Sequence, residues 1–337
     1  MSDRYSDLVP VNLITGFLGS GKTTLLKQLL EAPEMGNAAV IINEFGEIGL
    51  DHLLVQRIDG EVIVLQSGCI CCTIRTDLRD TILSLHEKSN QGIVPKFDRL
   101  VIETTGLADP APIVGTLMLD RVIRNHYRLG TIVTTVDAVN ADRHLKNNPE
   151  TAKQVAVADR IFITKTDLVP RSDITRLVPR LNSLNPAAEL LQSGTGVAFS
   201  DLLTADLYAD DKKSQEVEKW FAGQNTNLHP HHHNGHQHGE DIFSFTIEVT
   251  EPLDWTAFGL WLVMLLHAHG ENILRIKGIL NIIGEESPAV IHGVQHTIHP
   301  PQHLDKWPSQ DHRSRIIFIV KNISAAQIKK SFQIFCR

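Results

Sequence analysis

A glycine-rich segment near the start of the chain carries the strongest chemical signal. Residues 16–23 read G-F-L-G-S-G-K-T, which satisfies G-x-x-x-x-G-K-[ST] between an apolar run and a helix-forming run over residues 24–30. Such a loop turns backbone N–H groups toward phosphates, and the helix N-terminus adds about half a positive charge. We expect Lys22 to contact the β- and γ-phosphates and Thr23 to ligate Mg²⁺; an ordinary glycine-rich turn is the alternative. The expected nucleotide-binding residues are Gly16, Gly19, Ser20, Gly21, Lys22, Thr23 and Thr24.

A second segment indicates which base is bound. Residues 164–167 read T-K-T-D directly after an apolar run and are similar to the guanine-reading pattern N-K-x-D, with Thr164 in place of Asn. The Asp167 carboxylate can accept two hydrogen bonds from guanine, whereas adenine has no N1 donor and would leave the carboxylate unpaired. We expect Lys165 to cover the base with its aliphatic stem. The alternative is a strand end whose Asp167 caps a following helix.

An acidic residue lies where a nucleotide hydrolase of this kind carries its Walker B acid. Residues 100–106 read L-V-I-E-T-T-G. We expect Glu103 to hold a Mg²⁺-bound or attacking water and the Gly106 N–H to meet the γ-phosphate, with helix capping as the alternative for Glu103. The expected catalytic residues are thus Lys22, Thr23 and Glu103. For Asp137 and Asn140 we prefer a strand end followed by a helix cap.

Three of the four cysteines, Cys69, Cys71 and Cys72, lie within four residues, after the apolar run 62–66. This spacing is too close for a disulfide framework, and thiolates are good ligands for Zn²⁺. Adjacent cysteines seldom both bind one ion, so a tetrahedral site needs another ligand. Glu47, in the N-E-F-G-E segment 43–47, is a candidate for this further ligand. Thr23 is the expected metal ligand at the separate Mg²⁺ site. Buried, inert cysteines are the alternative.

A histidine-rich segment offers a second kind of metal ligand. It holds six of the 17 histidines, interleaved with Pro, Gly and Asn. Neutral imidazoles favour Zn²⁺, Ni²⁺ or Cu²⁺, so we expect it to collect or buffer metal; a solvated polar linker is the alternative. The histidines are His229, His231, His232, His233, His236 and His238.

Short apolar runs rich in Val and Ile alternate with longer periodic segments, which predicts an α/β fold with a doubly wound, mostly parallel sheet. The glycine-rich loop, the Cys segment, Glu103 and Asp167 each follow a predicted strand. They should therefore meet outside the carboxyl ends of the strands, where such sheets bind ligands. The predicted strands cover residues 11–15, 39–43, 62–66, 100–103, 132–136 and 161–164.

Length and composition suggest two domains without a nucleic-acid partner. The chain has 337 residues, 42% of them hydrophobic, and its net charge of -7 disfavours phosphate-backbone binding. No export signal or long apolar stretch occurs, so we expect a cytoplasmic protein with no membrane partner. We predict a P-loop GTPase domain over 8–205, a charged and His-rich linker over 206–240, and a smaller α+β domain over 241–335. Its predicted elements are a strand at 242–249, a helix at 255–267, strands around Ile279 and Ile317, and a helix from Ala325.

The five ordered motifs resemble those of the CobW, HypB and UreG group of P-loop GTPases, and within it the CobW-like branch of metallochaperones. They are the segments at 16–24, 43–47, 68–72, 103–106 and 164–167. The resemblance spans most of the chain and implies GTP hydrolysis with Mg²⁺, zinc or a related divalent ion at the Cys segment, and a CobW-like C-terminal domain. It also implies metal binding at the middle cysteine, Cys71, with carboxylates from around 43–47, although Ile42 stands where some relatives carry an acid.

The favoured function is a GTPase metallochaperone that passes a divalent transition metal to a client metalloprotein under nucleotide control. Its partners would be GTP or GDP, the metal and the client, and a second copy of the chain in a homodimer is left open. Two alternatives remain: a metal buffer with a structural nucleotide, and a P-loop phosphotransferase. Phosphate release would argue against the buffer, and phosphorylation of a small acceptor would favour the transferase.

Overall fold

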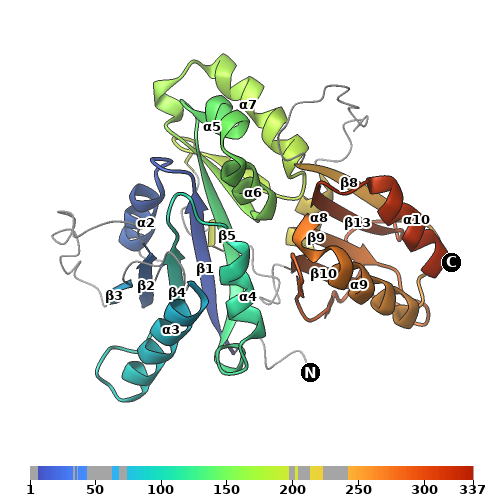
Figure 1. The fold of residues 1–337 in the computed structure, drawn as a ribbon, viewed down its shortest axis with the longest axis horizontal. Helices are drawn as coiled ribbons and strands as arrows, with labels where there is room; N and C mark the ends of the chain where they lie inside the picture. The colour runs from blue at the N-terminus through green and yellow to red at the C-terminus, as the bar shows by residue number, and fades with distance from the viewer. Residues whose placement is uncertain are drawn as a thin grey trace.

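The computed structural model describes residues 7–32, 35, 37–43, 63–67, 74–196, 202–203, 213–222 and 242–336. These residues form two sheet-based domains, the first coloured blue to yellow-green and the second orange to red in Figure 1. Within the described part of the chain, no helix combines the length and apolar character needed to cross a bilayer.

The first domain is built on a parallel sheet. In the described ranges it has seven strands in the order β3-β2-β4-β1-β5-β6-β7, and every neighbouring pair is parallel. The central position of β1 brings the glycine-rich loop out of the middle of the sheet. The strands are β1 Val9–Gly16, β2 Ala38–Asn43, β3 Ile63–Ser67, β4 Arg99–Glu103, β5 Tyr127–Asp137, β6 Arg160–Thr164 and β7 Glu189–Gln192.

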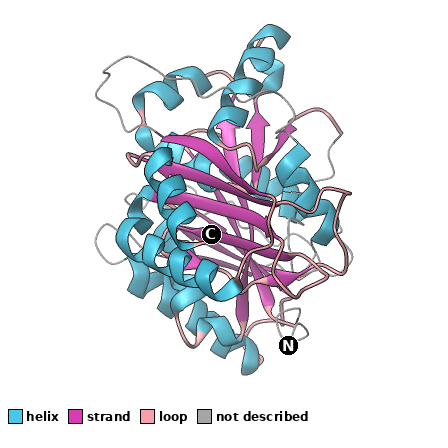
Figure 2. Cartoon of the chain, turned by 90° about the vertical axis from the view of Figure 1, so that its right-hand side faces the viewer, coloured by secondary structure: helices cyan, strands magenta, loops and turns pink. Residues whose placement is uncertain are grey.

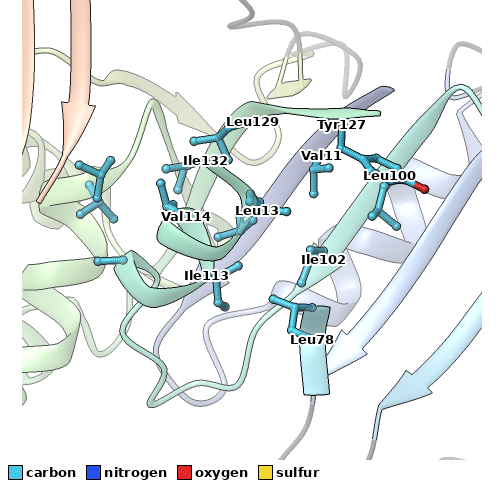
Figure 3. Close-up of a cluster of buried hydrophobic side chains, with 14 of the residues drawn as sticks. Val11, Leu13, Leu78, Leu100, Ile102, Ile113, Val114, Tyr127, Leu129 and Ile132 are labelled. Atoms are coloured by element: carbon cyan, nitrogen blue, oxygen red, sulfur yellow. The ribbon is translucent and has the colours of Figure 1, made fainter. Parts of the chain in front are cut away.

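Successive strand residues point to opposite sides of the sheet, so the apolar strands place hydrophobic side chains on both faces. Helices cover both of these faces. Val11 and Leu13 of β1 join a core with α3, α4 and α6, part of which Figure 3 shows. Ile14, on the other face, packs in a cluster with Leu25 of α2. The helices are α2 Lys22–Glu31, α3 Ile74–Asn90, α4 Ala111–Leu119, α5 Ala141–Asn147, α6 Pro149–Val157 and α7 Arg171–Leu184. The predicted α/β, doubly wound architecture is confirmed.

The second domain is an antiparallel sheet with two helices on one face (Figure 2). In β13, Ile316 and Phe318 pack with α9 and α10 in a core centred on Trp261, whose ring centroid lies 4.9 Å from that of Phe332. The Asp254 carboxylate accepts a bond of 2.7 Å from the Ala257 N–H and so caps α9. The elements are β8 Ile242–Val249, α9 Trp255–His269, β9 Ile273–Leu280, β10 Ala289–Val294, β11 Thr297–Ile298, β12 Gln302–His303, β13 Ser314–Lys321 and α10 Ala325–Phe335.

The opposite face of the second sheet packs on the first domain. Ile319 of β13 and Leu274 of β9 belong to the same core cluster as Val11 of β1. Ile317 instead joins a cluster with Trp220 of α8, a helix over Lys213–Ala222. This helix lies within the segment predicted to be a linker and was not predicted from the sequence. Strands β7, β10, β11 and β12 were not predicted either.

Candidate functional site

The glycine-rich loop leaves β1 at Gly16 and is bonded to the neighbouring strand. The Ser20 and Thr135 hydroxyl oxygens lie 2.6 Å apart, which ties the loop to β5. Gly21, at a φ of 92°, lies in the left-handed region directly before α2 begins at Lys22. Thr24 is exposed in the first turn of that helix. The sequence thus folds into the strand–loop–helix arrangement that the phosphate-binding pattern requires.

Lys22 and Thr23 lie where β1 and β4 end side by side. The Lys22 amino group donates to the carbonyl oxygens of Gly16 at 3.0 Å and Phe17 at 3.1 Å. The Thr23 hydroxyl donates a 2.6 Å bond to Glu103, which is 1% exposed at the end of β4. The structure therefore brings together the three residues expected to be catalytic.

The loop after β4 touches the glycine-rich loop directly. A Cβ atom on Gly106 would lie 2.6 Å from the backbone nitrogen of Leu18 and 2.7 Å from its Cα, so only glycine fits this approach. The Gln154 amide of α6 donates to the carbonyl oxygens of Gly106 at 3.1 Å and Ala108 at 3.0 Å. Gln154 was not among the expected site residues.

The T-K-T-D segment is joined to the glycine-rich loop by two hydrogen bonds. The Thr164 hydroxyl donates to the Ser20 carbonyl at 2.8 Å, and the Lys165 amino group donates to the Gly19 carbonyl at 2.8 Å. Asp167 is exposed in the short 3-10 turn Thr166–Leu168. Helix α7 begins at Arg171, so Asp167 does not cap it.

Asp137 holds the Lys165 side chain in place. Its carboxylate lies 2.8 Å from the Lys165 nitrogen and also accepts bonds of 2.9 Å from the Asn140 side chain and the Val139 N–H. Burial raises the pKa of Asp137, but the bonds from Lys165 and Asn140 outweigh burial and lower it. Asn140 does precede α5, yet its side chain makes no capping bond. The strand-end interpretation of Asp137 therefore missed its contact with Lys165 of the T-K-T-D segment.

Two further contacts, one of the glycine-rich loop and one of the T-K-T-D segment, were not predicted. The Phe17 ring lies 4.5 Å from the His144 ring of α5, and burial lowers the pKa of His144. The Thr166 hydroxyl donates a 2.8 Å bond to the Ser193 carbonyl, so the turn after β7 lies beside the T-K-T-D segment. The only sequence signal for this turn is the S-G-T-G composition of residues 193–196.

The predicted transition-metal ligands Cys69, Cys71, Cys72 and Glu47, and the six linker histidines, lie outside the described residues. Glu47 follows the strand end Asn43 of β2 in the chain, and the cysteines follow the strand end Ser67 of β3; these two strand ends are paired in register. Among the described residues, no group of three or more His, Cys, Asp or Glu side chains could hold a metal ion.

Comparison with known proteins identifies similar chains of nearly the same length. The family model described as CobW/HypB/UreG, nucleotide-binding domain, matches residues 10–192, and the cobalamin synthesis protein cobW C-terminal domain matches residues 242–335. The zinc chaperone YjiA of Escherichia coli K12 is 32% identical over 325 residues, covering 96% of this chain and 98% of YjiA.

Two further similarities extend over both domains. The zinc-regulated GTPase metalloprotein activator 1 of Schizosaccharomyces pombe is 29% identical over 307 residues, covering 83% of this chain and 74% of that protein. The crystal structure of Zn(II)-bound YjiA GTPase from E. coli matches with a TM-score of 0.72 at 28% identity, covering 98% of this chain and 99% of that one.

Proposed function

This chain belongs to the CobW/HypB/UreG family, and from that premise we propose that it is a GTPase that carries zinc, or a related divalent metal, to a client metalloprotein. The two family-model matches and the similarity to YjiA confirm the family resemblance that was inferred from the five motifs. The proposed reaction is GTP + H₂O to GDP + phosphate. The metal is the cargo, and its release to the client is the step under nucleotide control.

The observation that carries the GTPase proposal is the contact of Thr23, in the first turn of α2, with Glu103 at the end of β4. The hydroxyl and carboxylate oxygens are 2.6 Å apart, and Glu103 is buried. Hard oxygen donors of this kind suit Mg²⁺, so Thr23 and Glu103 would hold that ion, which would neutralise charge on the phosphates. The loop amides and Lys22 bind and orient the phosphates, with the phosphate oxygens replacing the loop carbonyls that Lys22 now contacts.

The base-reading segment supports guanine as the base. The exposed Asp167 carboxylate can accept from guanine N1–H and the 2-amino group together. Lys165 is fixed beside the loop by the Asp137 carboxylate and the Gly19 carbonyl, which preorganises its stem to cover the base. An adenine base would leave Asp167 without a matching donor.

The cargo site is proposed at Cys71, with Cys69, Cys72 and Glu47 as the other candidate ligands. Its support is that the segments 44–47 and 69–72 follow the paired strand ends Asn43 and Ser67, at the carboxyl edge of the same sheet as the glycine-rich loop. YjiA, a relative across nearly the whole chain, is named a zinc chaperone. The proposal further includes a cytoplasmic location, a client metalloprotein that receives the metal, and a homodimer as the state of assembly.

Calorimetric titration with Zn²⁺ in the presence of a non-hydrolysable GTP analogue or of GDP tests the proposal. The protein should have its histidines at 229–238 replaced by Ser, so that only the Cys site is titrated. We expect the two nucleotides to change Zn²⁺ affinity by about 5- to 150-fold, the usual range of linkage. Cys71→Ser should abolish binding, whereas Cys336→Ser should leave it unchanged. Equal Zn²⁺ affinities in both states would refute nucleotide-controlled delivery.

A further inference from the structure

Helix α6 connects the loop beside the glycine-rich loop to the second domain. Gln154, near its middle, is fully buried and donates to the carbonyl oxygens of Gly106 and Ala108. Asp159, two residues beyond the end of the helix, forms ion pairs with Arg275 and Lys277 of β9. A few residues of chain therefore separate a contact to the loop after β4 from a contact to the other domain.

The Gln154 amide and the glycine-rich loop both contact the loop after β4. Both amide hydrogens are used, one on each carbonyl, and the site is buried, so loss of the amide would leave two carbonyls without these donors. Gly106 also packs against the backbone of Leu18. A shift of Gly106 relative to Leu18 would therefore alter the bond that its carbonyl accepts from Gln154.

Hydrogen bonds hold the last turn of helix α6 and the residues that follow it together as one unit. The Thr134 hydroxyl of β5 donates a 2.7 Å bond to the backbone carbonyl of Gln154, a contact that does not involve the loop after β4. At its C-terminal end the buried Asn185 amide donates to the carbonyl oxygens of Val155 at 2.8 Å, Ala156 at 3.1 Å and Ala158 at 3.0 Å. A packed element of this kind transmits a displacement along its length.

The far end of this connection is a buried ionic contact between the domains. Burial raises the pKa of Asp159, but Arg275 and Lys277 outweigh burial and lower it to about 2. The carboxylate is therefore charged at neutral pH. It lies 2.9 Å from the Lys277 amino group, which also donates to the Ala187 carbonyl at 3.2 Å and lies 4.7 Å from the centre of the Trp220 ring.

We propose that Gln154 is a positioning residue that sets the loop 106–108 for the γ-phosphate, and that α6 carries the displacement of this loop to β9 of the second domain. The inference rests on the proposed GTPase function and adds how the C-terminal domain would sense the nucleotide. Because linkage is reciprocal, the contact between the domains must in turn alter the preference for GTP over GDP.

Gln154→Met tests the positioning role, since Met has similar length and no donor. We expect the affinity ratio for a non-hydrolysable GTP analogue over GDP to fall on the order of tenfold, the size of one to two net hydrogen bonds. Thr134→Val is the matched control, because it removes a buried bond to the Gln154 carbonyl but leaves the amide on the loop. A general loss of stability would weaken both nucleotides in both variants, whereas the proposed role changes the ratio only in Gln154→Met.

Hydrogen exchange tests the transmission, first on the parent protein and then on the two variants. Amides of β9, residues 273–280, should be protected differently in the GTP-analogue and GDP states, and this difference should vanish in Gln154→Met and persist in Thr134→Val. Equal protection of β9 in both states overturns the transmission, and an unchanged affinity ratio in Gln154→Met overturns the positioning role. A parent protein that binds neither guanine nucleotide overturns the proposed GTPase function itself.

Discussion

Replacing Asp159 by Asn removes the one carboxylate that Arg275 and Lys277 share, while nearly preserving the shape of the side chain. Both cations have side chains that are 2% exposed, so they would face a neutral amide without access to water. The substituted side chain still offers an oxygen for the 3.1 Å bond that Asp159 accepts from the Ile132 N–H. With the amide oxygen in that position, the amide nitrogen replaces the oxygen that both cations contact, so the change removes the charge and this acceptor while preserving the packing.

The expected loss of stability follows from these contacts. Removing one partner of a buried ion pair typically costs about 3 to 5 kcal/mol. Lys277 keeps its bond to the Ala187 carbonyl and its contact with the Trp220 ring, which places the expected loss near the lower end, about 3 kcal/mol at pH 7. The surface pair of Asp142 with Arg180, in which Asp142 is 73% exposed, offers a control: Asp142→Asn should cost less than about 1 kcal/mol.

The pH dependence gives an independent check. Because the pKa of Asp159 is lowered from 3.8 to about 2, its contribution is fully present above pH 3.8 and is lost as the pH falls through about 2. This pKa difference corresponds to about 2 kcal/mol that the parent loses in acid and the Asp159→Asn variant does not.

Urea unfolding, followed by far-UV circular dichroism and by tryptophan fluorescence, measures these losses. All four tryptophans lie in α8 or the second domain, so the fluorescence reports on that side of the interface, and the shared core predicts coincident transitions. A loss below about 1 kcal/mol at pH 7, or the same acid dependence in both proteins, would refute the reasoning.

Three further predictions concern the nucleotide site. Lys22→Ala should abolish phosphate release while far-UV circular dichroism still shows a folded protein, and parental turnover would contradict the phosphate-binding role. Asp167→Asn should weaken GTP relative to ATP in a competition assay, because the amide offers one acceptor in place of two; an unchanged ratio would argue against a guanine site. Gly106→Ala should reduce affinity for the GTP analogue on the order of tenfold, since its Cβ would lie 2.6 Å from the Leu18 nitrogen. Parental affinity for the analogue would mean that the loop can yield without disturbing phosphate binding.

Most of the fold could be predicted because its strands are local apolar runs, which helices bury on both faces of the first sheet. The predicted strand at 242–249 coincides with β8, and the predicted strands of the first sheet each fall on an observed one. Strand β7 was missed because it has only four residues, and β10 because His292 interrupts its apolar run. Helix α8 was missed because Val217 and Trp220 are its only buried large apolar residues, in a segment of otherwise polar character.

The site residues that were missed depend on contacts between distant parts of the chain. Asp137 gains its role from Lys165, 28 residues later, and Gln154 from Gly106, 48 residues earlier. Neither residue belongs to a motif with a fixed spacing. Lys22, Thr23 and Asp167 could be proposed from sequence because the loop or turn that carries each of them has a local pattern.

The core shared by the two sheets has a consequence for cleavage of the chain. Leu274, Val294 and Ile319 lie in one cluster with Val11 and Tyr127, so separating the domains would expose apolar surface on both. A protease cut between residues 223 and 241 would break one covalent link and leave this packing in place. The two fragments should therefore co-elute as a folded pair and reassemble when expressed separately, whereas either fragment alone should aggregate.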